Sequence, residues 1–103
     1  MKNLSLRQIR IFSAAARHLS FSRAAEEMHL SAPAVSMQIK ELEEELGSAL
    51  FLRSGRKVAL TPAGETFRIY AEKVLSALLE AEAVMQTIQG AKTKPPTPSQ
   101  DAK

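Results

Sequence analysis

The sequence predicts a mainly α-helical chain in which three helices are followed by a two-stranded β-hairpin and then by one long helix. Apolar residues recur at spacings of three and four through the first half of the chain, which is the periodicity of amphipathic helices. Two short β-type runs then flank the pair Ser54-Gly55, a turn sequence typical of hairpins. From Thr61 the helical spacing returns and continues to about Gln89.

The first helix is predicted from its start signal and its apolar face. Ser5 and Gln8 have the spacing of a capping box, in which each side chain bonds the other residue's backbone N–H. His18 closes the helix, where a cationic side chain interacts favourably with the helix dipole. The apolar face consists of Leu6, Ile9, Ile11, Phe12, Ala15 and Ala16.

A second, short helix is predicted from its N-cap Ser20 to His29. Its residues Ala24 and Ala25 are small enough for another helix to pack closely against them. The segment Met28 to Ser31 is the predicted turn. The second and third helices are therefore expected to form a helix-turn-helix.

The third helix, residues 31–46, has two different faces. One is an apolar stripe at helical spacing, which must face a core: Val35, Ile39, Leu42 and Leu46. The other carries short or flexible side chains that would let a helix lie deep in the major groove of DNA and touch base edges: Ala32, Pro33, Ser36, Met37 and Lys40.

Charge is distributed unevenly along this third helix. No carboxylate lies between Ser31 and Lys40. The far end holds four glutamates, which DNA phosphates would repel: Glu41, Glu43, Glu44 and Glu45. The N-terminal end is therefore predicted to dock on DNA, with Ser31 as N-cap and the positive end of the helix dipole toward the phosphates. The alternative is an ordinary amphipathic helix with a solvated acidic end.

The hairpin has the character of a DNA-binding wing, residues 51–60. Its strand-like runs are Leu50 to Arg53 and Lys57 to Leu60, and Gly55 tolerates the positive φ that a tight turn requires. No acidic residue lies between Leu46 and Leu60, so the hairpin suits phosphates or a narrow minor groove. Its basic residues are Arg53, Arg56 and Lys57. A solvated basic turn is the alternative.

The long helix opens with Thr61 as N-cap and Pro62 at the first helical position, and Gly90 is its predicted stop. At roughly 1.5 Å per residue it would span about 40 Å. Its apolar seam, widened by Leu79, consists of Phe67, Ala71, Val74, Leu75, Leu78, Ala81, Met85 and Ile88. A small domain cannot cover so long a stripe, so the seam is predicted to pair two chains as a homodimer. In the alternative, the helix folds back on its own domain.

Together these motifs resemble the N-terminal DNA-binding region of LysR-type transcriptional regulators, over Leu4 to about Gly90. The resemblance is carried by LRQIRIFSAAARHLSFSRAAEEMHLSAPAVSMQIKELEEELGSALFLRS and then by KVALTPAG. It implies a winged helix-turn-helix domain at 1–60 and a linker helix at 61–90 that pairs antiparallel with its mate. It also implies bacterial transcription regulation through binding to an interrupted inverted repeat in a promoter. The segments ARHLSFSRAAEEMHLS and AVSMQIKELE are similar to regulators of Calvin-cycle carbon-fixation operons.

The resemblance also assigns DNA contacts to individual residues. The recognition-helix positions are Ser31, Ala32, Pro33, Ser36, Met37, Gln38 and Lys40. Family members usually have Gln where this chain has Ala32, which offers a methyl contact, for example to a thymine methyl, instead of a hydrogen bond. Arg53 matches the wing arginine expected to enter the minor groove. Further wing and backbone contacts are expected from Arg56, Lys57, Ser22 and Arg23, and RNA polymerase is a candidate partner.

Charge and composition agree with a nucleic-acid partner. The net charge is +3, and residues 1–60 hold nine Lys and Arg against six Asp and Glu, while residues 61–103 hold five of each. The chain has no cysteine, which excludes disulfides and thiolate metal sites. No apolar run is long enough to span a membrane, and Arg7 and Arg10 interrupt any signal-peptide core, so we expect a cytoplasmic protein without membrane contact.

Catalytic, metal and cofactor sites are not expected. The chain has two histidines, His18 and His29, and one tyrosine, Tyr70, with no nucleophile–base pairing and no phosphate-binding glycine loop. The glutamates at the end of the third helix point in different directions, which favours a solvated surface over a metal site.

The last segment, residues 91–103, reads AKTKPPTPSQDAK and is polar and proline-rich, so we expect a disordered tail. The chain has neither the strand patterns nor the length for the effector-binding domain of LysR-type regulators, and no small-molecule site is expected. A truncated chain and a naturally short protein both fit this. An effector-less short form could instead modulate a full-length relative by forming mixed dimers. A winged helix used only for protein contact is a further alternative, but it would not need the basic hairpin.

Overall fold

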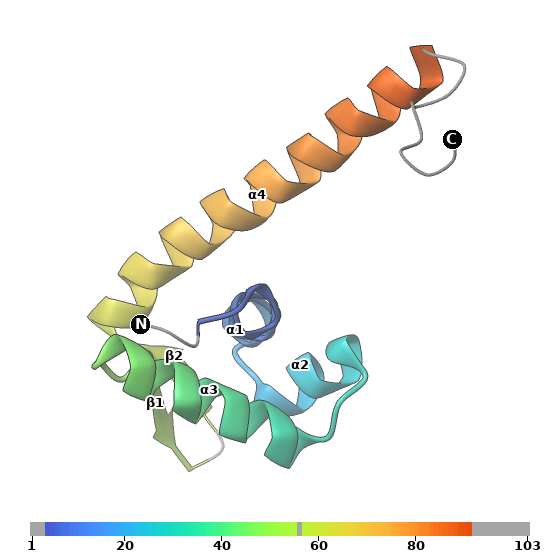
Figure 1. The fold of residues 1–103 in the computed structure, drawn as a ribbon. Helices are drawn as coiled ribbons and strands as arrows, with labels where there is room; N and C mark the ends of the chain where they lie inside the picture. Colours follow the sequence, from blue (N-terminus) through green and yellow to red (C-terminus); the bar gives the residue numbers. More distant parts are fainter. Residues whose placement is uncertain (1–3, 56, 92–103) are drawn as a thin grey trace. The chain divides into compact units, whose positions relative to one another are not determined.

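The computed structural model describes residues 4–55 and 57–91 and confirms the predicted order of elements (Figure 1). The elements are α1 (Leu6–His18), α2 (Phe21–Met28), α3 (Ala32–Leu46), β1 (Phe51–Ser54), β2 (Lys57–Leu60) and α4 (Pro62–Ala91). The chain divides into two compact units, Met1–Lys73 and Val74–Lys103. The first unit contains α1 to α3, the hairpin and the first turns of α4. The tail predicted at 91–103 lies outside the described residues, apart from Ala91 at the end of α4.

Side-chain caps begin all four of these helices, at the residues that the sequence predicts. Ser5 Oγ accepts a hydrogen bond from the Gln8 N–H at 3.2 Å, and Gln8 Oε1 accepts one from the Ser5 N–H, which completes the capping box. Ser20 and Ser31 accept equivalent bonds in α2 and α3. Thr61 Oγ1 accepts one from the first turn of α4 at 2.9 Å. These bonds satisfy N–H groups that a helix leaves unpaired at its N-terminus.

Left-handed residues follow the three short helices: Leu19 (φ 49°), His29 (φ 59°) and Gly47 (φ 75°). The prediction that Gly90 ends α4 is wrong, because the helix continues through Gly90 to Ala91. A glycine ends a helix with a left-handed cap only where it takes a positive φ. Among the described glycines, Gly47 and Gly55 do so.

The core of the first unit contains the apolar faces predicted for α1 and α3. The largest fully buried side chains are Phe12, Ile11, Ile39, Leu42, Leu50 and Val35. The ring of Phe12 packs on Phe51 of β1 and on Phe67 of α4, with ring centroids 5.4 and 5.0 Å apart. Ala24 and Ala25 of α2 are also buried, as their size predicts. At the edges of these faces, Leu6 is 43% exposed and Leu46 is half-buried.

The hairpin pairs β1 and β2 antiparallel, with Phe51 opposite Leu60 and Ser54 opposite Lys57. Gly55 takes a φ of 63° in the turn. The first strand begins one residue later than the predicted start at Leu50. The Leu50 carbonyl still accepts a hydrogen bond from the Thr61 N–H at 3.0 Å, in register with the ladder, whereas the Leu50 N–H donates to the Glu43 carboxylate at 2.8 Å.

The end of α3 differs from the solvated acidic surface that the sequence favours. Glu43 is half-buried, and its Oε2 accepts hydrogen bonds from the backbone N–H groups of Leu50 at 2.8 Å and Phe51 at 3.2 Å. Leu50 directly precedes β1 and Phe51 is its first residue, so the Glu43 carboxylate connects the hairpin to α3. Glu41 and Glu44 are exposed, as predicted.

The first turns of α4 belong to the core of the first unit. Ala71 is only 1% exposed, and Phe67 packs on Phe12. Both were predicted to lie in the dimer seam; that prediction is wrong for Ala71, which has almost no exposed surface to offer a partner, whereas Phe67 is half-buried and remains a predicted seam residue. Gly64 permits the close approach of α4, since a Cβ atom there would collide with the Leu50 carbonyl oxygen.

Candidate nucleic-acid interface

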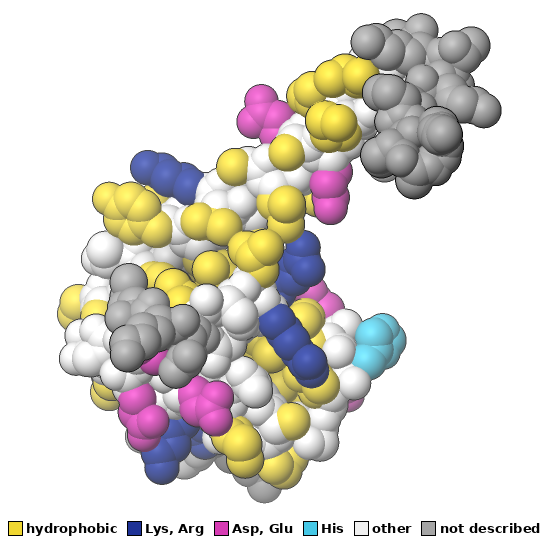
Figure 2. Space-filling model, viewed as in Figure 1, with side chains coloured by type: hydrophobic (Ala, Val, Ile, Leu, Met, Phe, Trp, Pro, Cys, Tyr) yellow, Lys and Arg dark blue, Asp and Glu magenta, His cyan; other side chains and the backbone are white. Residues whose placement is uncertain are grey.

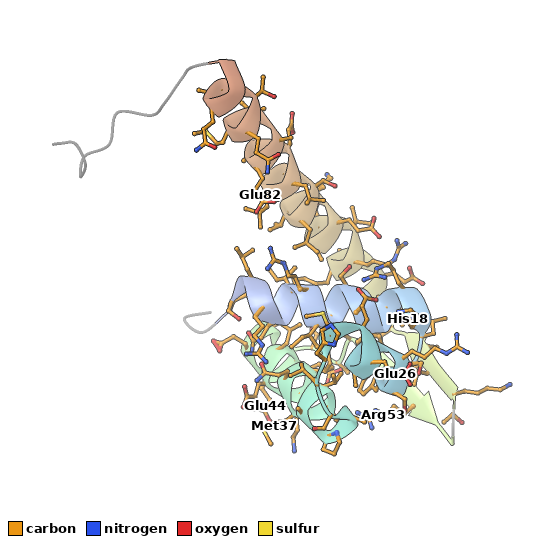
Figure 3. All side chains as sticks on the ribbon, turned by 90° about the vertical axis from the view of Figure 1, so that its right-hand side faces the viewer. His18, Glu26, Met37, Glu44, Arg53 and Glu82 are labelled. Carbon is orange, nitrogen blue, oxygen red and sulfur yellow. The ribbon has the colours of Figure 1, made fainter. Side chains whose placement is uncertain are left out.

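The first half of α3 exposes the face that the sequence assigns to DNA. Ser31, Ala32 and Pro33 are exposed at its start, and Lys40 is exposed further along. Met37 is 60% exposed and points away from the core (Figure 3). Ser36 and Gln38 are half-buried beside them, while Val35 and Ile39 anchor the opposite face. An exposed surface without carboxylates is therefore held on a rigid helix.

The turn between α2 and α3 holds this surface in place. His29 adopts the left-handed conformation, and the Leu30 N–H donates to the Ala25 carbonyl at 2.8 Å. Ser31 then caps α3, with its Oγ accepting from the Ala34 N–H at 3.2 Å. Pro33 has no N–H group and the Ala34 N–H is taken up by Ser31, so the positive end of the helix dipole is what favours an anion such as a phosphate here.

Arg53 lies on strand β1, and its side chain reaches both helices of the helix-turn-helix. Nη2 donates a hydrogen bond to Ser36 Oγ at 2.7 Å, and the guanidinium carbon lies 4.2 Å from the centroid of the Phe21 ring. The structure thus joins two residues predicted to contact DNA, Ser36 and Arg53. A shallow depression of about 270 Å³ lies beside them, and Lys40 and Phe51 also line it.

The tip of the wing carries the other basic residues of the hairpin. Lys57 is exposed opposite Ser54, next to the Gly55 turn. Arg56, the third basic residue predicted here, lies outside the described residues. On α2, the predicted backbone contacts Ser22 and Arg23 are exposed in the first turn.

Among the described lysines and arginines, Arg17 and Arg68 form ion pairs, and the others, including Arg7, Arg10 and Lys73, form none. Arg68 pairs with Glu65 and Glu72, at 3.5 and 3.1 Å. In contrast, the four described basic residues assigned to DNA form no ion pair: Arg23, Lys40, Arg53 and Lys57. Their charges therefore remain available to a polyanion.

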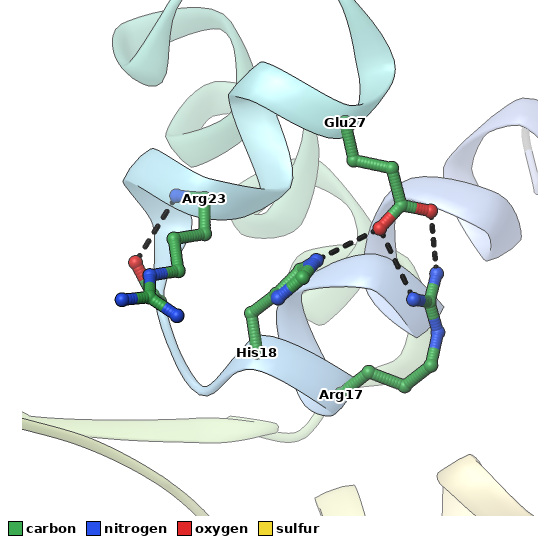
Figure 4. Close-up of polar contacts among 5 residues, drawn as sticks. Arg17, His18, Arg23 and Glu27 are labelled. Carbon is green, nitrogen blue, oxygen red and sulfur yellow. Dashed lines mark hydrogen bonds and ion pairs between the residues drawn. The ribbon is translucent and has the colours of Figure 1, made fainter.

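A cluster of charged side chains that the sequence did not predict joins α1 to α2 (Figure 4). Arg17 contacts both carboxylate oxygens of Glu27, at 3.1 and 2.6 Å, and His18 Nε2 lies 2.8 Å from Glu27 Oε1. The hydrogen bonds from Arg17 and then His18 lower the pKa of Glu27 to about 2. The sequence accounts for His18 only through the helix dipole, because nothing in the local pattern indicates that Glu27 lies beside it.

The second unit presents an apolar helix face. Most of the predicted seam from Val74 onward is exposed, with Leu75 and Leu78 half-buried. Among the exposed large side chains of this seam, the exposed fraction ranges from 41% at Val74 to 66% at Leu79. Figure 2 shows hydrophobic side chains along this helix. The exposed members are Val74, Leu79, Ala81, Met85 and Ile88, together with Val84 beside them.

The described residues contain no group of three His, Asp or Glu side chains placed to hold a metal ion. None of the described helices combines the length and apolar character that crossing a membrane requires.

Comparison with known protein sequences identifies relatives of the chain. The model of the bacterial regulatory helix-turn-helix proteins of the lysR family matches residues 6–65. The RuBisCO operon transcriptional regulator of Allochromatium vinosum is 50% identical over 88 residues, which are 85% of this chain and 29% of that protein. The glycine cleavage system transcriptional activator of Escherichia coli K12 is 47% identical over 81 residues, 79% of this chain and 27% of that protein. The chain thus spans less than a third of the length of these relatives.

Solved structures of similar fold include protein–DNA complexes. The BenM DNA-binding domain bound to catB site 1 DNA matches with a TM-score of 0.80 at 38% identity, over 85% of this chain and 95% of that one. The CbnR DNA-binding domain bound to DNA matches with a TM-score of 0.73 at 31% identity, over 86% of this chain and all of that one (100%). From its sequence motifs, its fold and these matches, the chain belongs to the lysR family of bacterial helix-turn-helix regulatory proteins.

Proposed function

We propose that this chain is the DNA-reading part of a LysR-type transcriptional regulator and that it binds an interrupted inverted repeat in a promoter as a homodimer. The observation that carries the proposal is the exposed, carboxylate-free half of α3 beside an Arg53 that is in no ion pair. The DNA complexes of the BenM and CbnR DNA-binding domains support it, because their folds match this one.

In this proposal α3 lies in the major groove and the wing lies over the adjacent backbone and minor groove. The proposed recognition-helix contacts are Ser31, Ala32, Pro33, Ser36, Met37, Gln38 and Lys40, with Gln38 reaching the DNA backbone. Ala32 offers a methyl group where a glutamine would form a hydrogen bond, so preference for a thymine methyl is expected at that step. The backbone and wing set is Ser22, Arg23, Arg53, Arg56 and Lys57.

The dimer is proposed to form through the exposed face of α4 from Val74 to Ile88. An apolar stripe on a single helix is stabilised when an equivalent helix covers it, and a symmetric dimer supplies one. Two domains held in this way would reach two half-sites of an inverted repeat. Ala71 does not contribute because it is buried in the first unit, and Phe67 is half-buried with its ring packed on Phe12.

The likeness to a RuBisCO operon regulator at 50% identity supports a carbon-fixation promoter as the first DNA to test. Promoter binding implies a cytoplasmic location and RNA polymerase as a further partner. The proposed activity is binding, with no catalytic step and no cofactor.

The test is fluorescence anisotropy of a labelled duplex that carries a LysR-type interrupted inverted repeat, compared with a scrambled duplex, at two salt concentrations. We expect the repeat to bind at least about tenfold more tightly at the higher salt, because base contacts survive where phosphate attraction is screened. Equal binding of both duplexes, lost together as salt rises, would contradict sequence reading. Co-expression with a full-length relative and mass measurement would then test the mixed-dimer function.

A further inference from the structure

The Arg53 guanidinium is held by two uncharged groups. The Phe21 ring lies under it, with 4.2 Å between the guanidinium carbon and the ring centroid. Ser36 Oγ accepts one of its N–H bonds at 2.7 Å. No carboxylate pairs with Arg53 among the residues that the structure describes.

This kind of support orients a cation without neutralising it. An aromatic face attracts a guanidinium through its quadrupole, and the Ser36 hydroxyl takes up only one of five N–H donors. A carboxylate partner would hold the side chain as well, but it would also compete with a DNA phosphate for the same donors. Arg17 is an arginine with such a carboxylate partner, because it donates hydrogen bonds to both oxygens of Glu27.

The Phe21 ring is itself held by the core. It packs edge-on against Phe51, with ring centroids 5.3 Å apart, and Phe51 packs on the fully buried Phe12. A row of rings therefore connects the interior of the first unit to the Arg53 guanidinium. A flexible arginine loses rotamer freedom when it binds DNA, and a side chain already held in position loses less.

We propose that Phe21 is a positioning residue for DNA binding: its ring holds the Arg53 guanidinium beside Ser36, ready for the DNA backbone. This inference rests on the proposed function and adds a residue that does not itself contact a base. It also joins α2, α3 and β1 into one unit through a single arginine side chain. While Arg53 donates to Ser36 Oγ, the hydroxyl hydrogen of Ser36 remains free to donate to an acceptor in the groove.

The test compares binding of the inverted-repeat duplex by wild type, Phe21→Leu, Arg53→Ala and the double variant over a range of salt concentrations. Phe21→Leu should weaken binding by roughly two- to tenfold while leaving the salt slope unchanged, because no charge is lost. Arg53→Ala should weaken binding and reduce the slope by about one. In the double variant, Phe21→Leu should cost nothing further, since the group it positions is gone.

Two control variants match these changes. Phe21→Tyr keeps the ring and should bind like wild type. Arg68→Ala removes the same charge from a residue paired with Glu65 and Glu72, and should change the affinity and slope less than Arg53→Ala does. The proposal is overturned if Phe21→Leu weakens binding as much in the Arg53→Ala background as in wild type, because Phe21 would then act through the fold.

A measurement on the free wild-type protein decides the same point if Phe21→Leu does not fold. Protons of Arg53 beside the ring face should show upfield-shifted NMR resonances, and ordinary shifts would overturn the proposal. A wild-type chain that binds neither duplex contradicts the proposed function instead, and the NMR measurement still decides whether Phe21 holds Arg53.

Discussion

The carboxylate of Glu43 accepts a hydrogen bond from the backbone N–H of Leu50 at 2.8 Å and a second from Phe51, and so joins the last turns of α3 to the first strand of the wing. This side chain thus helps to hold together two surfaces proposed to contact DNA. From the sequence, the acidic end of α3 is expected only to lie away from DNA phosphates. The structure gives one of its residues, Glu43, a structural role as well.

Glu43→Gln should destabilise the protein by about 1–3 kcal/mol. Both part-buried N–H groups donate to the same carboxylate oxygen, and a neutral amide oxygen would accept the same two hydrogen bonds more weakly. Urea unfolding followed by circular dichroism measures the change. Glu44→Gln is the matched control, because Glu44 is exposed and accepts no such bonds. Equal effects of the two changes would contradict the role given to Glu43.

Ser36→Ala and Arg53→Ala should affect DNA binding differently. Ser36→Ala removes a hydroxyl that we propose contacts base edges, so target binding should weaken by about 1 kcal/mol or more while binding to random DNA changes less. Arg53→Ala removes a side-chain charge that we propose contacts the DNA backbone, so binding to both DNAs should weaken and the salt dependence should flatten. Anisotropy titrations with both duplexes measure these effects. If the two variants lose affinity equally on both duplexes, the roles are wrongly assigned.

Glu27 should make part of the stability depend on acidic pH. Its folded-state pKa is about 2, below the ordinary value of 4.5, so its contribution is complete above about pH 4.5 and is lost as the pH falls toward 2. The Glu27 side chain is 38% exposed, so solvent screening limits the contribution to under about 1 kcal/mol. Urea unfolding of wild type and Glu27→Gln should differ at pH 6 and converge near pH 2. A difference that persists at low pH would contradict this cause.

Met85→Glu should weaken the dimer at least about tenfold, because a carboxylate would be buried in the apolar seam of α4. Ser76→Glu is the matched control, since the helical spacing puts Ser76 on the opposite side of the helix from the seam. Sedimentation equilibrium of wild type and both variants measures the dissociation constants. A dimer that tolerates Met85→Glu as well as Ser76→Glu must use a different surface.

Local signals along the chain were sufficient to predict most of the secondary structure. Ser5, Ser20, Ser31 and Thr61 each cap the helix that the sequence assigns to them. A cap acts on backbone groups three residues away, and an apolar stripe repeats within one helix, so both can be recognised in one segment. The exception is Gly90, where α4 continues because glycine permits a helix end without requiring one.

Contacts between distant segments were decided by the tertiary structure. Nothing near Arg53 indicates that its guanidinium meets Phe21 and Ser36, and nothing near Glu43 indicates that it binds the start of β1. The apolar residues of α4 also look alike in sequence, yet Ala71 is buried in the first unit and Met85 is exposed. The sequence by itself therefore determined the helices, the hairpin and the face of α3 that is free of carboxylates, since these depend on neighbouring residues. Only tertiary packing decided which charges stay unpaired and which apolar residues of α4 stay exposed, because a side chain's partners depend on which segments the fold brings together.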